Sequence, residues 1–158
     1  MSLKSWIHIP RGSHFSLANI PFGVISTNAK PTPRPAIAIG ESVLDLDIFV
    51  AANGFQALEN FRQFNLEEVF AKPTLNAFAA LGRPAHQVIR KYLQDVFADD
   101  TPFPAVLKEN ENLKLNAIHL QKDVLNHLPM EIGDYTDFFA GVNHAVNVSI
   151  RNVGREVC

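Results

Sequence analysis

The stretch Ala36-Ile37-Ala38-Ile39-Gly40-Glu41-Ser42-Val43-Leu44-Asp45-Leu46 predicts a β-hairpin, because two short β-prone runs flank a turn that contains glycine. Residues 20–26 form another apolar run, which Pro21 and Gly23 interrupt. Between the two, prolines at positions 31, 33 and 35 alternate with other residues, which favours an extended loop and excludes a helix. Together with residues 22–26, the hairpin predicts a small antiparallel sheet or a partly open barrel.

Helical patterns follow the hairpin. Residues 47–72 carry phenylalanines without a clean period, so we expect short helical pieces there. A helix should begin near Pro73, with Thr74 as its N-cap, and Gly82 stands where a C′ residue would end it. The next helix, over about 84–98, is amphipathic. Its expected buried stripe consists of Val88, Ile89, Tyr92, Leu93, Val96 and Phe97.

The most polar part of the chain is the stretch 108–126. It predicts a linker or a surface excursion, and we place a boundary between two modules there. We expect the histidines of this region, His119 and His127, to be surface residues.

Composition excludes several classes of function. Of the 158 residues, 47% are apolar and 19% are charged, so the chain can bury a core. The net charge is −2 and the basic residues are scattered, so we expect no nucleic-acid partner. The N-terminal residues lack an apolar run, so we expect neither a signal peptide nor a membrane span. The single cysteine, Cys158, excludes an internal disulfide and favours a reducing compartment, the cytosol.

Chemically useful groups are concentrated in residues 133–144, Gly133-Asp134-Tyr135-Thr136-Asp137-Phe138-Phe139-Ala140-Gly141-Val142-Asn143-His144. If Asp137 begins a helix, seven residues bring His144 to within ~20° of it, displaced by about 10 Å along the axis. That separation is too long for both side chains to bind one ion, because ligand atoms lie about 2–2.5 Å from a metal. It suits two separate roles: Asp137 could hold Ca²⁺ or Mg²⁺, and His144 could act as a general base.

A structural interpretation of the same residues stays open at this point. Asp134 could be an ordinary N-cap, and His144, beside Ala145 and Val146, could be a hydrogen-bonded core histidine. One aspartate and one histidine do not make a Ca²⁺ or Mg²⁺ site, which needs further oxygen ligands.

Four blocks of the sequence stand out together. The most specific is Ile132-Gly133-Asp134-Tyr135-Thr136-Asp137-Phe138, followed at fixed spacing by His144 and Asn147-Val148. The others are Ile20-Pro21-Phe22-Gly23-Val24, Ala38-Ile39-Gly40 with Leu44-Asp45-Leu46, and Pro73-Thr74-Leu75-Asn76-Ala77-Phe78 with Leu81-Gly82. In these blocks the chain resembles the fumarylacetoacetase family, whereas the region 104–127 matches the family poorly.

The resemblance implies an α+β fold that is mainly β with short helices. Residues 1–118 would form an SH3-like N-terminal β-barrel domain, and residues 119–158 a linker and the truncated start of an all-β catalytic domain. It also implies the reaction of the family, which hydrolyses the carbon–carbon bond of the diketo acid 4-fumarylacetoacetate to fumarate and acetoacetate in tyrosine and phenylalanine catabolism. The family uses Ca²⁺ or Mg²⁺ and acts as a homodimer.

Three residues receive roles through the resemblance. Asp137 stands at the family's first metal-ligand position, and His144 stands at the position of the general base. Phe139 stands at a substrate-contacting position that is Tyr in animal members, so the hydrogen bond of that hydroxyl is missing. The cation would polarise the diketo oxygens while His144 takes a proton from water.

The tail departs from the family after Val148, and the family's substrate-contacting arginine falls on Val153. The other metal-binding carboxylates belong to a domain that we expect this chain to lack, so we expect an enzyme that is cut short and inactive alone. The alternative is a non-catalytic module that docks on a full-length enzyme or another partner. In either case four apolar side chains should face water: Phe138, Phe139, Val142 and Val146.

Overall fold

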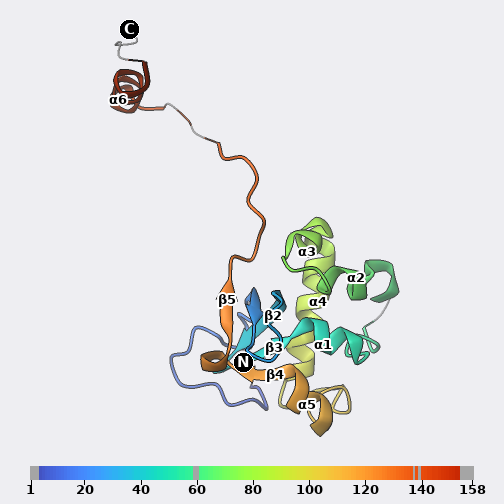
Figure 1. Ribbon diagram of the computed structural model, residues 1–158. Coiled ribbons are helices and arrows are strands. Elements are labelled where there is room, and N and C mark those ends of the chain that lie inside the picture. Colours follow the sequence, from blue (N-terminus) through green and yellow to red (C-terminus); the bar gives the residue numbers. More distant parts are fainter. Residues whose placement is uncertain (1–3, 59–60, 137, 139, 154–158) are drawn as a thin grey trace.

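A five-stranded antiparallel sheet organises the chain in the computed structural model, which describes residues 4–58, 61–136, 138 and 140–153. The strand order is β4-β3-β2-β1-β5 (Figure 1). The expected strand over residues 22–26, the hairpin and the antiparallel sheet are thereby confirmed. The strands are β1 (Phe22–Ser26), β2 (Arg34–Ile39), β3 (Ser42–Asp45), β4 (Ile118–Leu120) and β5 (Leu125–His127).

The hairpin of β2 and β3 has apolar residues on both faces. Ile37 lies opposite Leu44 and packs into the main core. Ala36 and Val43 lie on the other face, in a smaller cluster with Ile25. Successive side chains in a strand point to opposite faces of the sheet. Because both faces of this hairpin pack against apolar residues, its sequence is a nearly continuous apolar run.

Gly40 makes the tight turn of this hairpin possible. Its φ is +56°, a conformation that costs other residues free energy because of their Cβ. A Cβ at this position would also collide with the carbonyl oxygen of His8.

The polar stretch 108–126 does not form the linker that its composition predicts. It contains α5 (Glu111–Ala117) and β4, and it ends within β5. In the sheet, Val43 of β3 lies opposite His119, and Val24 of β1 lies opposite His127, so these short strands occupy the two edges. Edge strands pair through backbone groups and need no apolar alternation. The polar composition of this stretch therefore gave no indication of the two strands.

Helices α1 to α5 lie together beside the sheet, and their presence confirms the α+β class (Figure 1). The longest helix, α4, has 16 residues, and the longest strand, β2, has six. In the described ranges, no helix combines the length and the apolar character that crossing a bilayer requires. The remaining helices are α1 (Leu46–Ala51), η1 (Phe61–Phe64), α2 (Leu66–Phe70), α3 (Asn76–Ala80), η2 (Gln121–Asp123) and α6 (Val142–Val153).

The amphipathic helix is α4 (Gly82–Phe97), and its predicted stripe is confirmed except at one position. Val88 is 43% exposed, because it lies about 100° around the axis from Ile89, beside the buried stripe. The start expected at Thr74 is wrong as well. Helix α3 begins at Asn76, and Leu75 occupies the N-cap position without a side-chain hydrogen bond.

Aromatic rings fill the space between α1, α2 and α4. The ring of Phe55 contacts the rings of Phe49, Phe70 and Tyr92 at centroid distances of 5.0, 5.6 and 5.7 Å. The buried hydroxyl of Tyr92 donates a hydrogen bond to the carbonyl oxygen of Gly54 at 2.6 Å. Burial raises the pKa of Tyr92 to about 12.

Replacement of Gly54 by alanine should destabilise this aromatic cluster. The new Cβ would lie 2.5 Å from carbons of the buried Phe49 ring, and overpacking of this kind costs about 1–3 kcal/mol. Urea unfolding measures the change. Gly133→Ala is the matched control, because its Cβ would meet nothing within 4 Å. Equal stability of the two variants would contradict the packing described here.

The folding free energy should also depend on the protonation of Tyr92. The raised pKa means that the folded state keeps this proton up to about pH 12, while the unfolded chain loses it near pH 10. The contribution is therefore complete below pH 10, and the free energy of unfolding should fall as the pH rises from 10 to 12. Ultraviolet titration of phenolate in Tyr135→Phe, which leaves Tyr92 as the sole tyrosine, measures the shift. Titration of the folded variant near pH 10 would contradict it.

Candidate functional site

The segment with the predicted chemistry lies beyond the sheet, on an extended arm. After β5 the chain runs without helix or strand through residues 128–136, and α6 lies at the far end of this arm (Figure 1). Large apolar side chains along the arm face solvent, among them Ile132, Tyr135 and Phe138. An exposed apolar series of this kind indicates a surface that another structure covers.

The base of the arm is attached to the beginning of α3. The backbone N–H of Leu75 donates to the carbonyl oxygen of Pro129 at 2.7 Å. The side chain of Asn76 accepts a hydrogen bond from the backbone N–H of Glu131 at 2.8 Å and donates to the carbonyl oxygen of Glu131 at 3.2 Å. The two bonds of Asn76 join residues that are 55 positions apart in the sequence.

The three residues predicted to form the site are placed unequally. His144 is an exposed residue in the first turn of α6. Asp137 and Phe139 lie outside the residues that the structure describes. Their predicted roles therefore stay predictions, as does the role of His144.

The helix supposed to begin at Asp137 begins later. Helix α6 starts at Val142, and the described residues Phe138 and Ala140 precede it without helical structure. Gly141 stands directly before the helix, where its low helix propensity disfavours extension toward the N-terminus. The spacing argument that aligned Asp137 with His144 on one helical face consequently does not apply, and Asp134 does not cap this helix.

The exposure expected for this segment is confirmed at two of its four residues. Phe138 and Val142 are 78% and 80% exposed. Val146 is half-buried, and Phe139 lies outside the described ranges.

A resident Ca²⁺ or Mg²⁺ ion would need several donor side chains close together. Within the residues that the structure describes, no three side chains of His, Cys, Asp or Glu lie close enough together to hold a metal ion. Ca²⁺ takes six to eight oxygen ligands, and Mg²⁺ demands an octahedral shell. The described residues therefore do not fit such an ion by themselves.

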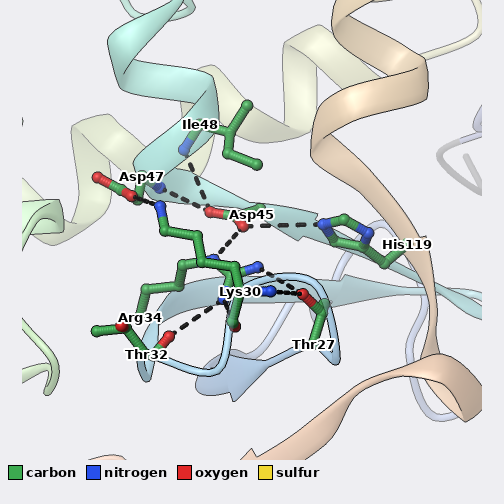
Figure 2. A network of polar contacts seen from close by, with 8 residues as sticks. All are labelled: Thr27, Lys30, Thr32, Arg34, Asp45, Asp47, Ile48 and His119. Atoms are coloured by element: carbon green, nitrogen blue, oxygen red, sulfur yellow. Dashed lines mark hydrogen bonds and ion pairs between the residues drawn. The ribbon is translucent and has the colours of Figure 1, made fainter.

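A buried ionic network joins β2 and β3, where sequence patterns indicated no site (Figure 2). Arg34 of β2 and Asp45 of β3 form an ion pair, and their side chains are only 3% and 0% exposed. Arg34 also donates to the carbonyl oxygens of Lys30 and Thr32, at 2.8 and 3.1 Å. Asp45 accepts from the backbone N–H groups of Asp47 and Ile48, at 3.1 and 3.2 Å, and so caps α1.

The arrangement around Asp45 is structural in character. Its two oxygens are occupied by Arg34 and by the N-terminus of α1, which leaves little capacity for a ligand or a transferred proton. Nε2 of His119 lies 3.8 Å from the carboxylate, and its side chain is only 23% exposed. The surface position expected for His119 is therefore corrected to a half-buried one beside Asp45.

His127 likewise has a specific partner. Its Nε2 lies 2.8 Å from the hydroxyl of Ser26. A hydroxyl beside an imidazole can be a nucleophile and its base, but here Ser26 is only 6% exposed. The two residues are diagonal neighbours across the β1–β5 pairing, so we interpret the contact as one that holds the edge strand. The surface position expected for His127 is therefore corrected to a half-buried one.

Loss of the arginine from the buried pair should destabilise the domain strongly. Arg34→Met leaves Asp45 as an unpaired buried charge, which costs about 3–5 kcal/mol. The further change Asp45→Asn removes that charge and should recover part of the loss. Chemical unfolding measures both variants.

The matched control is the neighbouring pair of Lys30 and Asp47, whose side chains are 45% and 26% exposed. Lys30→Met should cost no more than about 1 kcal/mol. Similar losses of unfolding free energy for Arg34→Met and Lys30→Met would show that the buried pair stabilises the domain no more than the exposed pair does.

Comparison with known proteins supplies the remaining observation. Residues 18–129 match the family model described as "Fumarylacetoacetase N-terminal". The fumarylacetoacetase of Aspergillus fumigatus is 51% identical over 98% of this chain, which corresponds to 35% of that relative. The fumarylacetoacetases of Arabidopsis thaliana and Bos taurus are 40% and 35% identical, over 98% and 96% of this chain. The chain thus spans about a third of the length of the curated relatives it matches.

Proposed function

The chain belongs to the fumarylacetoacetase family, and we propose that it is the N-terminal part of an enzyme that hydrolyses 4-fumarylacetoacetate to fumarate and acetoacetate. The observation that carries the proposal is the match of residues 18–129 to the family's N-terminal domain. The alignment with the Aspergillus fumigatus relative extends the similarity to 98% of the chain. The pathway would be tyrosine and phenylalanine catabolism, and the substrate is a small diketo acid.

His144 is the general base in this proposal. It takes a proton from water, and the resulting hydroxide attacks the carbonyl carbon that becomes the new carboxylate of fumarate. The carbon–carbon bond then breaks, and its electrons leave with acetoacetate, which takes up a proton. Support comes from the exposed position of His144 on α6, where a further domain can cover it.

Asp137 and Phe139 complete the proposed site. Asp137 would contribute one carboxylate to a divalent cation, Ca²⁺ or Mg²⁺, which would supply electrophilic stabilisation when bound. Within the described residues no donor set for the ion is present, so these residues alone do not hold it. Phe139 would contact the substrate through its ring alone, without the hydroxyl of a tyrosine.

The residues of this chain are proposed to be insufficient for catalysis on their own. The chain corresponds to 35% of the Aspergillus fumigatus relative, and the described residues provide no cation site. We further propose that the complete enzyme is a homodimer and acts in the cytoplasm, without nucleic-acid or membrane partners. The single cysteine supports a reducing compartment.

A refined domain boundary is part of the proposal. We place the end of the first domain after Pro129 rather than after residue 118. Support comes from β4 and β5, which pair with β3 and β1, and from the hydrogen bond that the N–H of Leu75 donates to the carbonyl oxygen of Pro129. The family match ends at residue 129 as well.

A second candidate function is a non-catalytic module that docks on a full-length enzyme or another partner. The exposed apolar residues of the arm, Ile132, Tyr135 and Phe138, favour it. The experiment below separates the two functions, because a docking module needs neither His144 nor hydrolysis.

The test joins this chain to the part of the Aspergillus fumigatus relative that it does not cover. The chimera should hydrolyse fumarylacetoacetate in the presence of Ca²⁺ or Mg²⁺, whereas the 158-residue chain alone should not. His144→Ala in the chimera should lower kcat by about 10²–10⁴-fold, the usual contribution of a general base.

His14→Ala is the matched control, because His14 is an exposed histidine distant in sequence from the arm. Hydrolysis by a folded chimera that is indifferent to His144→Ala would remove the role of this residue. A folded but inactive chimera would favour the docking module.

A further inference from the structure

The side chain of Asn76 binds the arm in a manner that resembles strand pairing. Its amide oxygen accepts from the N–H of Glu131 at 2.8 Å, and its amide nitrogen donates to the C=O of the same residue at 3.2 Å. A carboxamide carries both an acceptor and a donor, so it satisfies both backbone groups of one residue at once. Asn76 belongs to the sequence block 73–78.

The residues beside Asn76 are anchored in the main core. Leu75 and Phe78, on either side of it, are buried. The ring of Phe78 stacks on Phe22 of β1 at a centroid distance of 4.6 Å and also contacts the ring of Phe70. A hydrogen bond from Leu75 to Pro129 lies beside the Asn76 contact. The position of Asn76 is therefore determined by the main core.

The arm itself has no such support in its own sequence. After Glu131, the described residues up to Thr136 lack helix and strand, and Ile132 and Tyr135 are largely exposed. The direction in which the chain continues toward residues 137–144 therefore depends on where its base is held. Misplacement of a catalytic group by about 1 Å can cost a factor of 10² in rate.

We propose that Asn76 is a positioning residue, whose carboxamide holds the backbone of Glu131 and thereby sets the path of the segment that carries Asp137 and His144. The proposal rests on the proposed function for the roles of those two residues. The contact itself is independent of them. Because the Asn76 side chain is exposed, its hydrogen bonds contribute little to global stability. Variants of Asn76 can therefore lose the contact with Glu131 while the domain stays folded.

Amide hydrogen exchange on the 158-residue chain, resolved by NMR, tests the contact directly. Asn76→Ala should raise the exchange rate of the Glu131 amide on the order of tenfold and leave the thermal midpoint nearly unchanged. Asn76→Asp retains an oxygen that accepts from the Glu131 N–H, so it should retain most of the protection. Asn19→Ala, which removes an exposed amide bonded to the carbonyl of His14, is the matched control and should leave Glu131 unaffected.

Kinetics of the chimera test the consequence. Asn76→Ala should lower kcat on the order of tenfold with little change in KM, Asn76→Asp should recover part of the loss, and Asn19→Ala should have no effect. Unchanged exchange at Glu131, or unchanged kcat in an active chimera, would overturn the proposal. An inactive parent chimera would count against the proposed function, and the exchange experiment would then still decide whether Asn76 holds the arm.

Discussion

The buried pair of Arg34 and Asp45 is the constraint on which the rest of the domain depends. Opposite charges removed from water are tolerated when they pair and when their remaining hydrogen-bonding capacity is used. Arg34 binds carbonyl groups of the loop before β2, and Asp45 caps α1. One pair thus holds a loop, two strands and a helix in a single arrangement (Figure 2).

The path of the chain to its proposed catalytic segment follows from this arrangement. The α5–β4 connection brings His119 to the edge of the sheet near Asp45, and β5 then pairs with β1 at the opposite edge. From there the backbone reaches the beginning of α3, where Asn76 holds Glu131. The described residues up to His127 therefore position the arm, and the arm presents His144 together with exposed apolar side chains that suit a covering domain.

Prediction and structure agree where the sequence pattern extends over only a few neighbouring residues. The hairpin and the stripe of α4 were predictable, because turn glycines and apolar periodicity act over a few residues. The prediction of Thr74 as an N-cap is wrong. A residue caps a helix only if its backbone adopts the cap geometry, and here the helix begins at Asn76, with Leu75 at the N-cap position. The polar edge strands β4 and β5 are not predictable from local patterns, because their partner strands lie far away in the sequence. The predicted helix start at Asp137 is also wrong, since α6 begins at Val142.

By itself, the sequence determined the α+β class, the hairpin turn at Gly40, the buried face of α4 and the resemblance carried by residues 132–138 with His144. Each of these signals is local, because it rests on neighbouring residues and their conformational preferences. Only the tertiary structure decided that Arg34 pairs with Asp45, that His127 contacts Ser26 and that Asn76 holds Glu131. These partners are 11, 101 and 55 residues apart, and polar groups so separated meet only when the packed core positions the elements that carry them.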